Sequence, residues 1–192
     1  MNQSSNNQED DRLILQTLAG ESSAFEGLIE KYQNRLYHSM THVLRNSTDA
    51  EDIVQETFVK AFTKLSTFRG GSQFYTWLHR IAHNSAISQI RKRKPIESLD
   101  HDSGVSAATL EGHDVSPSQR IEQQEQSQQL NDALGRLKEE QRRVLVLREL
   151  DGLDYDAISE ILEVPVGTVR SRLHRARTQL KEELQRQFTD TE

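Results

Sequence analysis

Hydrophobic residues recur at helical spacing on both sides of one stretch of the chain that has no periodicity. Between residues 22 and 45 they repeat mostly at intervals of three and four and so share one side of an α-helix: Phe25, Leu28, Ile29, Tyr32, Leu36 and Val43. Helical patterns return in shorter pieces from residue 120 to residue 188. No segment shows the sustained alternation of a half-buried strand. We therefore predict an all-α protein.

A stretch without helical periodicity, residues 96–119, divides the chain. It is rich in Ser, Asp and Glu and poor in large apolar residues, a composition that cannot bury a core. Pro95 ends the helical pattern before it, because a proline inside a helix lacks the N–H that the backbone ladder needs. We predict two small helical domains, residues 1–96 and 122–192, joined by a flexible acidic linker over 97–121.

Polar residues mark the expected helix ends. The stretch Thr48-Asp49-Ala50-Glu51 has the form of a capping box and predicts a helix from there to about Leu65. The glycines at 70 and 71 predict a loop, because glycine permits backbone angles that other residues resist, and a helix then runs from about 73 to 94. Asp154 is the expected cap of a short helix that ends before Pro165.

The composition and the motifs exclude several classes of function. The 192 residues include no cysteine, which excludes disulfides, thiolate zinc sites and Cys nucleophiles. The polar, acidic start does not resemble a signal peptide, and no apolar run approaches the ~20 residues of a membrane helix, so we expect a cytoplasmic protein without membrane insertion. The His38/His42 and His79/His83 pairs lack the HExxH pattern of metal sites. We expect no metal, no cofactor and no catalytic residue.

Charge alternates strongly along a chain whose formal net charge is −6. Residues 57–96 contain eight Lys or Arg residues and no acid, and residues 164–181 contain five and no acid. Two basic surfaces separated by an acidic segment suit a protein that holds a polyanion at two places.

The second basic window forms a helix-turn-helix pattern. A short helix ends near Glu163, and a longer one follows with Val169, Leu173 and Ala176 on its apolar side. Candidate DNA-contacting residues lie opposite that side or beside it: Arg170, Ser171, Arg172, His174, Arg175, Arg177 and Thr178. An ordinary solvated helix is the alternative, but such helices usually interleave Glu with Arg.

The first basic window mixes cations with aromatic residues, a combination suited to single-stranded nucleic acid, where phosphates meet charge and unstacked bases meet rings. The candidates are Phe68, Arg69, Trp77, Arg80, Asn84, Arg91 and Lys92. Packing in the core is the alternative for the aromatic residues; we assign Phe62 and Phe74 to it, and Trp77 stays open between the two. Arg80 and Asn84 have no apolar role.

The helix before this window has an acidic face. Its inward residues include Ala50, Ile53 and Thr57, and its outward face is expected to carry a set that could contact another protein: Asp49, Asp52, Gln55, Glu56 and Val59. A face that merely meets solvent is the alternative. A metal site would need Glu-x-x-His partners, and the sequence has none.

These segments resemble a known family. GTVRSRLHRAR, preceded by LDYDAISEILEVPV and QRRVLVLREL, resembles region four of sigma-70-type factors of the extracytoplasmic-function (ECF) group, and DAEDIVQETFVKAF with TFRGGSQFYTWLHRIAHN resembles region two. The resemblance covers most of residues 20–186. It implies a non-enzymatic protein that binds bacterial core RNA polymerase and promoter DNA, with an anti-sigma factor as a further partner.

The resemblance also implies roles for the segments. The second helix of the helix-turn-helix would read the upstream promoter element, and the 66–73 loop with the following helix would capture non-template bases of the minus-ten element. The acidic helix would dock on the polymerase clamp, and the acidic linker would occupy the passage that later holds nascent RNA. One departure is Glu163, which stands where the family usually has Gly at the turn.

A conventional helix-turn-helix regulator, with residues 1–96 as a sensor or dimerisation domain, is the rival interpretation. It predicts specific duplex binding by the protein alone, whereas a sigma factor needs core polymerase.

Overall fold

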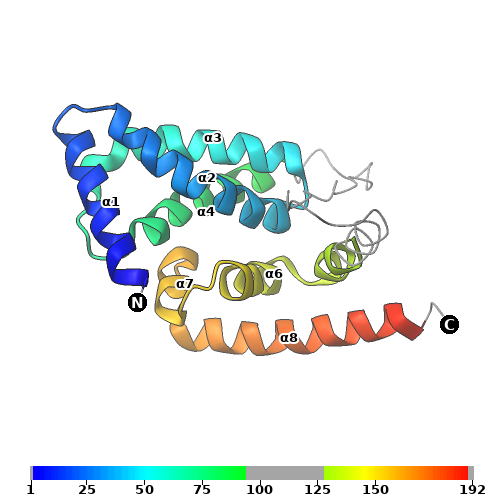
Figure 1. The fold of residues 1–192 in the computed structure, drawn as a ribbon. Coiled ribbons are helices and arrows are strands. Elements are labelled where there is room, and N and C mark those ends of the chain that lie inside the picture. The colour runs from blue at the N-terminus through cyan, green and yellow to red at the C-terminus, as the bar shows by residue number, and fades with distance from the viewer. Residues whose placement is uncertain (1, 94–127, 190–192) are drawn as a thin grey trace, which may run out of the picture.

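The computed structural model describes residues 2–93 and 128–189 (Figure 1). Within these two ranges every regular element is a helix, which confirms the all-α prediction. The predicted linker and both predicted domain boundaries lie outside the described residues. The N-terminal unit, residues 2–93, contains α1 (Asn2–Leu18), α2 (Ser23–Leu44), α3 (Ser47–Lys64), the 3-10 turn η1 (Leu65–Thr67) and α4 (Phe74–Arg93). The C-terminal unit, residues 128–189, contains a helical segment over 128–136, α6 (Glu139–Leu145), the π-helical turn η2 (Val146–Leu150), α7 (Tyr155–Leu162) and α8 (Val166–Thr189).

In the N-terminal unit, α2, α3 and α4 pack against one another and α1 lies across one end (Figure 1). Leu28, Ile53 and Leu78, one from each of the three packed helices, are fully buried between them. Asp10 holds α1 against α2. Its side chain is buried, and its carboxylate accepts hydrogen bonds from Lys31 Nζ at 2.6 Å and from Tyr32 Oη at 2.5 Å, both on α2. Burial opposes the charged form of Lys31, but its bonds to Asp10 and Glu9 outweigh burial and raise its pKa.

The start of α3 corrects the predicted capping box. Asn46, in extended backbone conformation, is the N-cap, and its side chain accepts a hydrogen bond from the Asp49 amide at 3.0 Å. The helix therefore begins at Ser47, and Thr48 lies inside its first turn. Asparagine and threonine can both cap a helix by accepting a hydrogen bond from an amide three residues later. Here Asn46 acts as the cap instead of Thr48, and the helix begins two residues earlier than predicted.

The C-terminal unit has the predicted helix-turn-helix. Asp154 caps α7 as predicted and accepts a hydrogen bond from the Ala157 amide at 2.8 Å. Glu163 ends α7 in the left-handed conformation, with φ 53°, a conformation that costs a residue with a Cβ about 1–2 kcal/mol. The Ser159 hydroxyl donates to the carbonyl of Val164 at 2.6 Å across the turn and helps to hold it.

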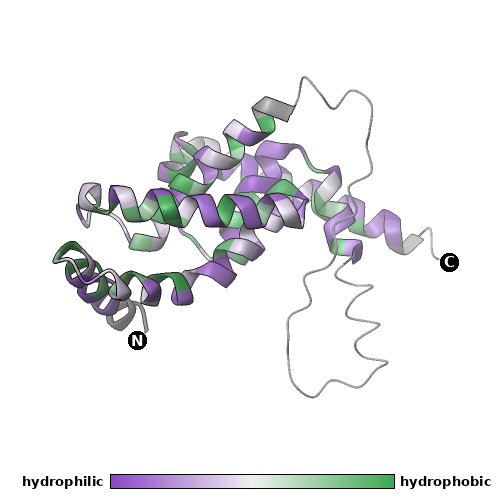
Figure 2. Cartoon of the chain, turned by 90° about the horizontal axis from the view of Figure 1, so that it is seen from above, coloured by the Kyte–Doolittle hydropathy of each residue, from purple (hydrophilic) through white to green (hydrophobic). Residues whose placement is uncertain are grey.

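The two units pack against each other. In this interface α4 contacts α7, and α2 contacts η2. Arg142 Nε donates to the carbonyl of Val43 at 3.3 Å, near the end of α2. The Arg45 guanidinium lies directly against Gly135 and fills the space that a Cβ at this position would take. Figure 2 shows hydrophobic and hydrophilic residues alternating along the helices, as expected where each helix has one buried side.

Because His83 is buried, we expect the free energy of unfolding to decrease in mild acid. Its side chain is 4% exposed, and burial, the charge of Arg143 and the proximity of His79 lower its pKa to about 3. In the unfolded chain, the His83 imidazole binds a proton near pH 6.5, whereas in the folded chain it stays neutral until the pH approaches 3. The contribution of neutral His83 to the free energy of unfolding is therefore fully present above pH 6.5 and is lost as the pH falls toward 3. We expect the free energy of unfolding to fall by about 1.4 kcal/mol between pH 7.5 and 5.5 from this residue.

Urea denaturation at the two pH values measures this effect, and His83→Gln is the comparison variant. His42, whose pKa is lowered mainly by burial, acts in the same direction and should keep its own contribution in the variant. A pH dependence of equal size in His83→Gln and in the wild type would contradict the assignment.

Candidate functional site

The exposed face of α8 carries the candidate residues of the second basic window. Val169, Leu173 and Ala176 are buried against the rest of the C-terminal unit. The candidates on the other side are exposed, except Arg172, which is half-buried: Arg170, Ser171, Arg172, His174, Arg175, Arg177 and Thr178. Because the apolar side of α8 is buried, its basic side faces outward, as in a recognition helix.

Ion pairs divide the arginines of α8 into two groups. Arg177 donates from Nε at 3.0 Å and from Nη2 at 2.6 Å to one oxygen of Glu149, and this hydrogen bonding raises its pKa. Arg172 Nη2 lies 2.8 Å from the carboxylate of Glu140. In the described part of the chain we find no ion pair of Arg175, which leaves its guanidinium available for a ligand.

Aromatic packing surrounds the loop after η1. The rings of Phe68, Phe74 and Trp77 lie 5.4–5.8 Å from one another between centroids. Trp77, for which the sequence leaves core packing and nucleic-acid contact both open, is only 6% exposed, because the loop folds Phe68 back over it. Phe62, expected in the core, is instead half exposed and meets Phe25 edge-on.

The polar candidates of the first basic window are more accessible. Arg69 and Asn84 are exposed, and Arg80 is half-buried. Arg91 and Lys92 belong to α4, but their side chains lie outside the described residues. The loop and α4 thus bring Arg69, Arg80 and Asn84 to the region around the aromatic cluster, although the aromatic rings themselves are largely covered.

Arg80 has a partner that the sequence does not predict. Its Nη1 lies 3.3 Å from the carboxylate of Glu160 on α7, and the hydroxyl of Ser72 lies 3.4 Å from the same oxygen. Glu160, a residue of the C-terminal unit, therefore pairs with the Arg80 guanidinium, which we expect to contact nucleic acid.

The acidic face of α3 is exposed except at its first member. Asp52, Gln55 and Glu56 are exposed, and Val59 is 65% exposed, which is unusual for an apolar side chain. Asp49 is only 6% exposed and accepts a hydrogen bond from Gln89 Nε2 at 3.1 Å, so its expected outward position is corrected. The cause is α4, which packs along this side of the first turn of α3.

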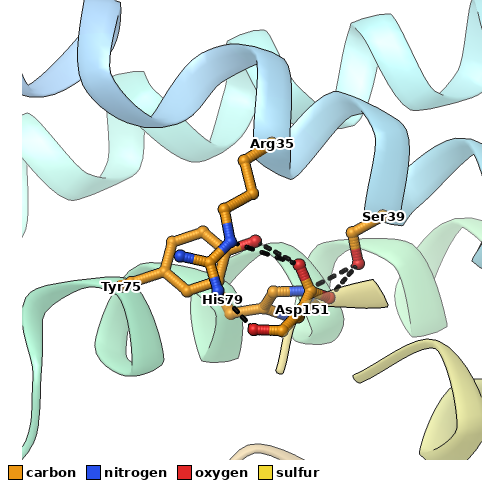
Figure 3. Close-up of polar contacts among 5 residues, drawn as sticks. All are labelled: Arg35, Ser39, Tyr75, His79 and Asp151. Carbon is orange, nitrogen blue, oxygen red and sulfur yellow. Dashed lines mark hydrogen bonds and ion pairs between the residues drawn. The ribbon is translucent and has the colours of Figure 1, made fainter. Parts of the chain in front are cut away.

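Sequence reasoning missed a buried polar cluster around Asp151, which follows η2 (Figure 3). Its carboxylate accepts hydrogen bonds from Ser39 Oγ and from Tyr75 Oη, both at 2.6 Å. His79 Nε2 lies 3.0 Å from Ser39 Oγ and 3.3 Å from the carboxylate, and Arg35 Nε lies 3.8 Å from it. All four partners belong to the N-terminal unit.

The electrostatics of this cluster favour a charged carboxylate. Burial alone would raise the pKa of Asp151, but the hydrogen bond and charge of His79, with the hydrogen bonds of Ser39 and Tyr75, together lower it. Burial and the neighbouring Asp151 charge raise the pKa of Tyr75 far above its ordinary value, so Tyr75 keeps its proton and donates. Asp151-Gly152 has the composition of a turn, and nothing in the sequence periodicity marks this aspartate as buried.

Two further findings apply to residues 2–93 and 128–189. None of their helices is long and apolar enough to cross a membrane. They also contain no group of three or more His, Asp or Glu side chains placed to hold a metal ion.

Family comparison assigns both units. Residues 28–96 match the model of sigma-70 region 2, and residues 127–180 match the model of sigma-70 region 4. The chain is also 35% identical over 188 residues to RNA polymerase sigma-H factor of Pseudomonas aeruginosa, covering 93% of this chain and 95% of the relative. This chain belongs to the ECF sigma factors of the sigma-70 family.

Other sigma factors agree in sequence and fold. The ECF RNA polymerase sigma-E factor of Haemophilus influenzae is 37% identical over 188 residues, covering 92% of this chain and 95% of that protein. The structure of the sigma factor RpoE with the anti-sigma factor NepR from Bartonella quintana superposes with a TM-score of 0.68 at 29% identity, covering 84% of this chain and 96% of that one. In this ECF sigma factor, α2 to α4 therefore form region 2, and α6 to α8 form region 4.

Proposed function

We propose that this ECF sigma factor binds bacterial core RNA polymerase in the cytoplasm and directs it to promoters through two DNA contacts, without catalysis of its own. The observation that carries the proposal is the presence of both sigma-70 regions, in order, each with an exposed polar face opposite a buried apolar one. Two faces on one chain can hold two separate promoter elements at once.

The upstream element is assigned to α8. Its exposed residues can enter the major groove, where Arg175 is available to bond bidentately to guanine. Ser171 and His174, also exposed, lie on the same face nearer the start of the helix, which is the end of a recognition helix that usually meets base edges.

The minus-ten element is assigned to the loop after η1 and to α4. Arg69 and Arg80 supply charge for the phosphates, and Asn84 supplies an exposed amide that can pair with the edge of an unstacked base. The rings of Phe68, Phe74 and Trp77 pack against one another at the same loop and the start of α4. Extruding a base costs a few kcal/mol, which binding against such a surface offsets.

Core polymerase is assigned to the exposed acidic face of α3, made of Asp52, Gln55, Glu56 and Val59. The half-exposed Phe62 lies one turn beyond Val59 on the same helix, so apolar surface continues along it. An anti-sigma factor is the further partner that we propose, because RpoE of Bartonella quintana was solved with one.

Reconstitution with core enzyme tests the proposal. Run-off transcription from a candidate promoter should require both the protein and core polymerase, and the protein alone should bind the promoter duplex weakly. Tight, specific duplex binding without polymerase, together with no promoter-directed transcript in its presence, would favour a conventional helix-turn-helix regulator instead.

Asn84→Ala should slow promoter opening without preventing closed-complex formation. The lost contact is to an unpaired base, and one hydrogen bond contributes about 1 kcal/mol, so strand opening should slow about fivefold. Permanganate footprinting of the holoenzyme on duplex DNA measures opening, and a pre-melted bubble template should largely restore the rate.

Ser88→Ala is the matched control, because Ser88 is exposed one turn further along α4 and its hydroxyl donates only to the Asn84 carbonyl. An equally large defect of Asn84→Ala on bubble and duplex templates would place the residue outside the opening step.

A further inference from the structure

Two arginine side chains lie close together where the end of α2 meets the C-terminal unit. Arg142 of α6 donates from Nε to the carbonyl of Val43 at 3.3 Å, and the guanidinium of Arg45 lies against Gly135. Burial and the charge of Arg45 lower the pKa of Arg142 to about 10. The two guanidinium groups are therefore near enough to repel each other.

No ion pair offsets these two charges within residues 2–93 and 128–189. Glu139 and Glu140, the acids nearest to Arg142 along α6, each pair with another arginine of the C-terminal unit. Arg142 is held instead by neutral backbone carbonyls. Like charges without a counter-ion destabilise a fold, and a bound anion would remove this cost.

The backbone of Arg45 is in a conformation that arginine seldom adopts. Arg45 ends α2 with φ 58° and ψ 28°, in the left-handed region where a Cβ is disfavoured and glycine or asparagine is usual. Strained backbone of this kind often occurs where a protein holds a ligand. The helix could end at lower cost with a smaller residue, so the position favours a function for the guanidinium.

Gly135 leaves the space that the Arg45 guanidinium fills, because a Cβ on Gly135 would collide with the guanidinium carbon and both terminal nitrogens. Arg45 Nε is buried and has no hydrogen-bond partner in the described part of the chain, so the group has unused donor capacity. The Arg45 and Arg142 side chains as a whole are only half-buried, and solutes can reach them.

Two guanidinium groups match the chemistry of a phosphate dianion. Each presents N–H donors in a fixed plane that fits two oxygens of a phosphate group. A phosphate monoester carries a charge of about −1.5 to −2 at pH 7 and would balance both arginines. A diester of the DNA backbone carries one negative charge and would leave one cation without a counter-charge.

We propose that Arg45 and Arg142 form a binding site for the terminal phosphate of a small phosphorylated compound, where the end of α2 meets α6 and the segment 128–136. Neither residue belongs to the sets that we assign to polymerase or to promoter DNA. The inference therefore goes beyond the proposed function and does not rest on it.

Amide NMR spectra of the isotope-labelled full-length protein test the site, with methyl phosphate as the probe. We expect saturable shifts of the Arg45, Gly135 and Arg142 amide signals over one range of concentration. Dimethyl phosphate, a diester of similar size, should bind at least about tenfold more weakly, because one charge-assisted interaction is lost. This comparison also separates a free phosphorylated compound from a nucleic-acid backbone, whose phosphates are diesters.

Gly135→Ala tests the geometry without removing a charge. The added Cβ takes the space of the flexible Arg45 guanidinium, which must move, so the affinity for methyl phosphate should fall about tenfold. Alanine is a better helix former than glycine, so the unfolding midpoint should not fall. Arg136→Gln is the matched control: it removes a neighbouring charge that pairs with Glu183, and it should bind methyl phosphate as the wild type does.

Arg45→Asn separates binding from a purely structural role of the arginine. Asparagine accepts the left-handed conformation, so the variant should unfold at the same temperature as the wild type or a higher one. It should also lose the saturable shift of the Gly135 signal. If Arg45 serves only to pack the fold, the unfolding midpoint should fall instead, and methyl phosphate should bind Gly135→Ala as it binds the wild type.

Three further results would overturn the proposal. Methyl phosphate could shift only the signals of α8, which would place the anion on the recognition helix. The two esters could bind equally, or both Arg45→Asn and Gly135→Ala could bind methyl phosphate with wild-type affinity. No promoter or polymerase enters these measurements, so failure of the proposed function is seen separately, in the transcription assay.

Discussion

Asp52→Arg should weaken binding to core RNA polymerase about 100-fold and leave the fold unchanged. Asp52 is the first residue of the exposed acidic face of α3, one turn before Gln55 and Glu56. If this face docks on a basic surface, the reversal replaces an attraction by a like-charge contact, which costs several kcal/mol, and about 3 kcal/mol corresponds to the stated factor. Competition against the wild type for a limiting amount of core enzyme measures the loss.

The fold should tolerate this change because the Asp52 side chain is exposed and contributes nothing to the core. Circular dichroism and the unfolding midpoint should therefore match the wild type. Asp11→Arg, the same reversal at an exposed position of α1, is the matched control and should compete normally. Normal competition by Asp52→Arg as well would leave the acidic face as a surface that only meets solvent.

The sequence predicted those features that depend on one helix alone. The buried side of α8 follows from the repeat of Val169, Leu173 and Ala176, and the structure buries all three. The cap of α7 by Asp154 follows from one residue and one amide three positions later. Such features need only the period of the helix and the geometry of its first turn.

Positions that depend on a second helix were predicted less well. Helical period placed Asp49 outward and left Trp77 undecided between core and surface, whereas in the structure α4 covers the first and the Phe68 loop covers the second. A helical wheel gives the direction of a side chain from its own axis, and it does not give the position of the neighbouring helix. The assigned roles of these residues in binding stay predictions.

The cluster around Asp151 could not be predicted from local pattern. Tyr75 and Arg35, two of its partners, precede it by 76 and 116 residues. The sequence instead indicated two separate domains, because each half has its own helical periods, and the packing of α4 on α7 leaves no trace in either period. Buried polar contacts between distant segments become visible only when the tertiary arrangement is known.

Arg175→Ala and Arg177→Ala should have different effects on promoter binding when the holoenzyme is tested on promoters with altered upstream elements. Arg175 is exposed and without an ion pair in the described part of the chain, so its truncation should remove a preference worth about 1–3 kcal/mol at one or a few base pairs. Arg177 is bonded to Glu149 through two nitrogens, and it can offer only phosphate contact at the edge of the helix. Its truncation should weaken all promoters evenly.

Salt titration of the same complexes distinguishes the two effects. Loss of one phosphate contact reduces the slope of log K against log salt by about 1, and we expect this for Arg177→Ala only if DNA displaces Glu149 from Arg177. Glu149→Gln, which frees Arg177 without removing it, should then strengthen binding on every promoter variant. Equal losses for Arg175→Ala at every base-pair substitution would remove Arg175 from the base-reading role, because a bidentate contact to one base cannot weaken all sequences alike.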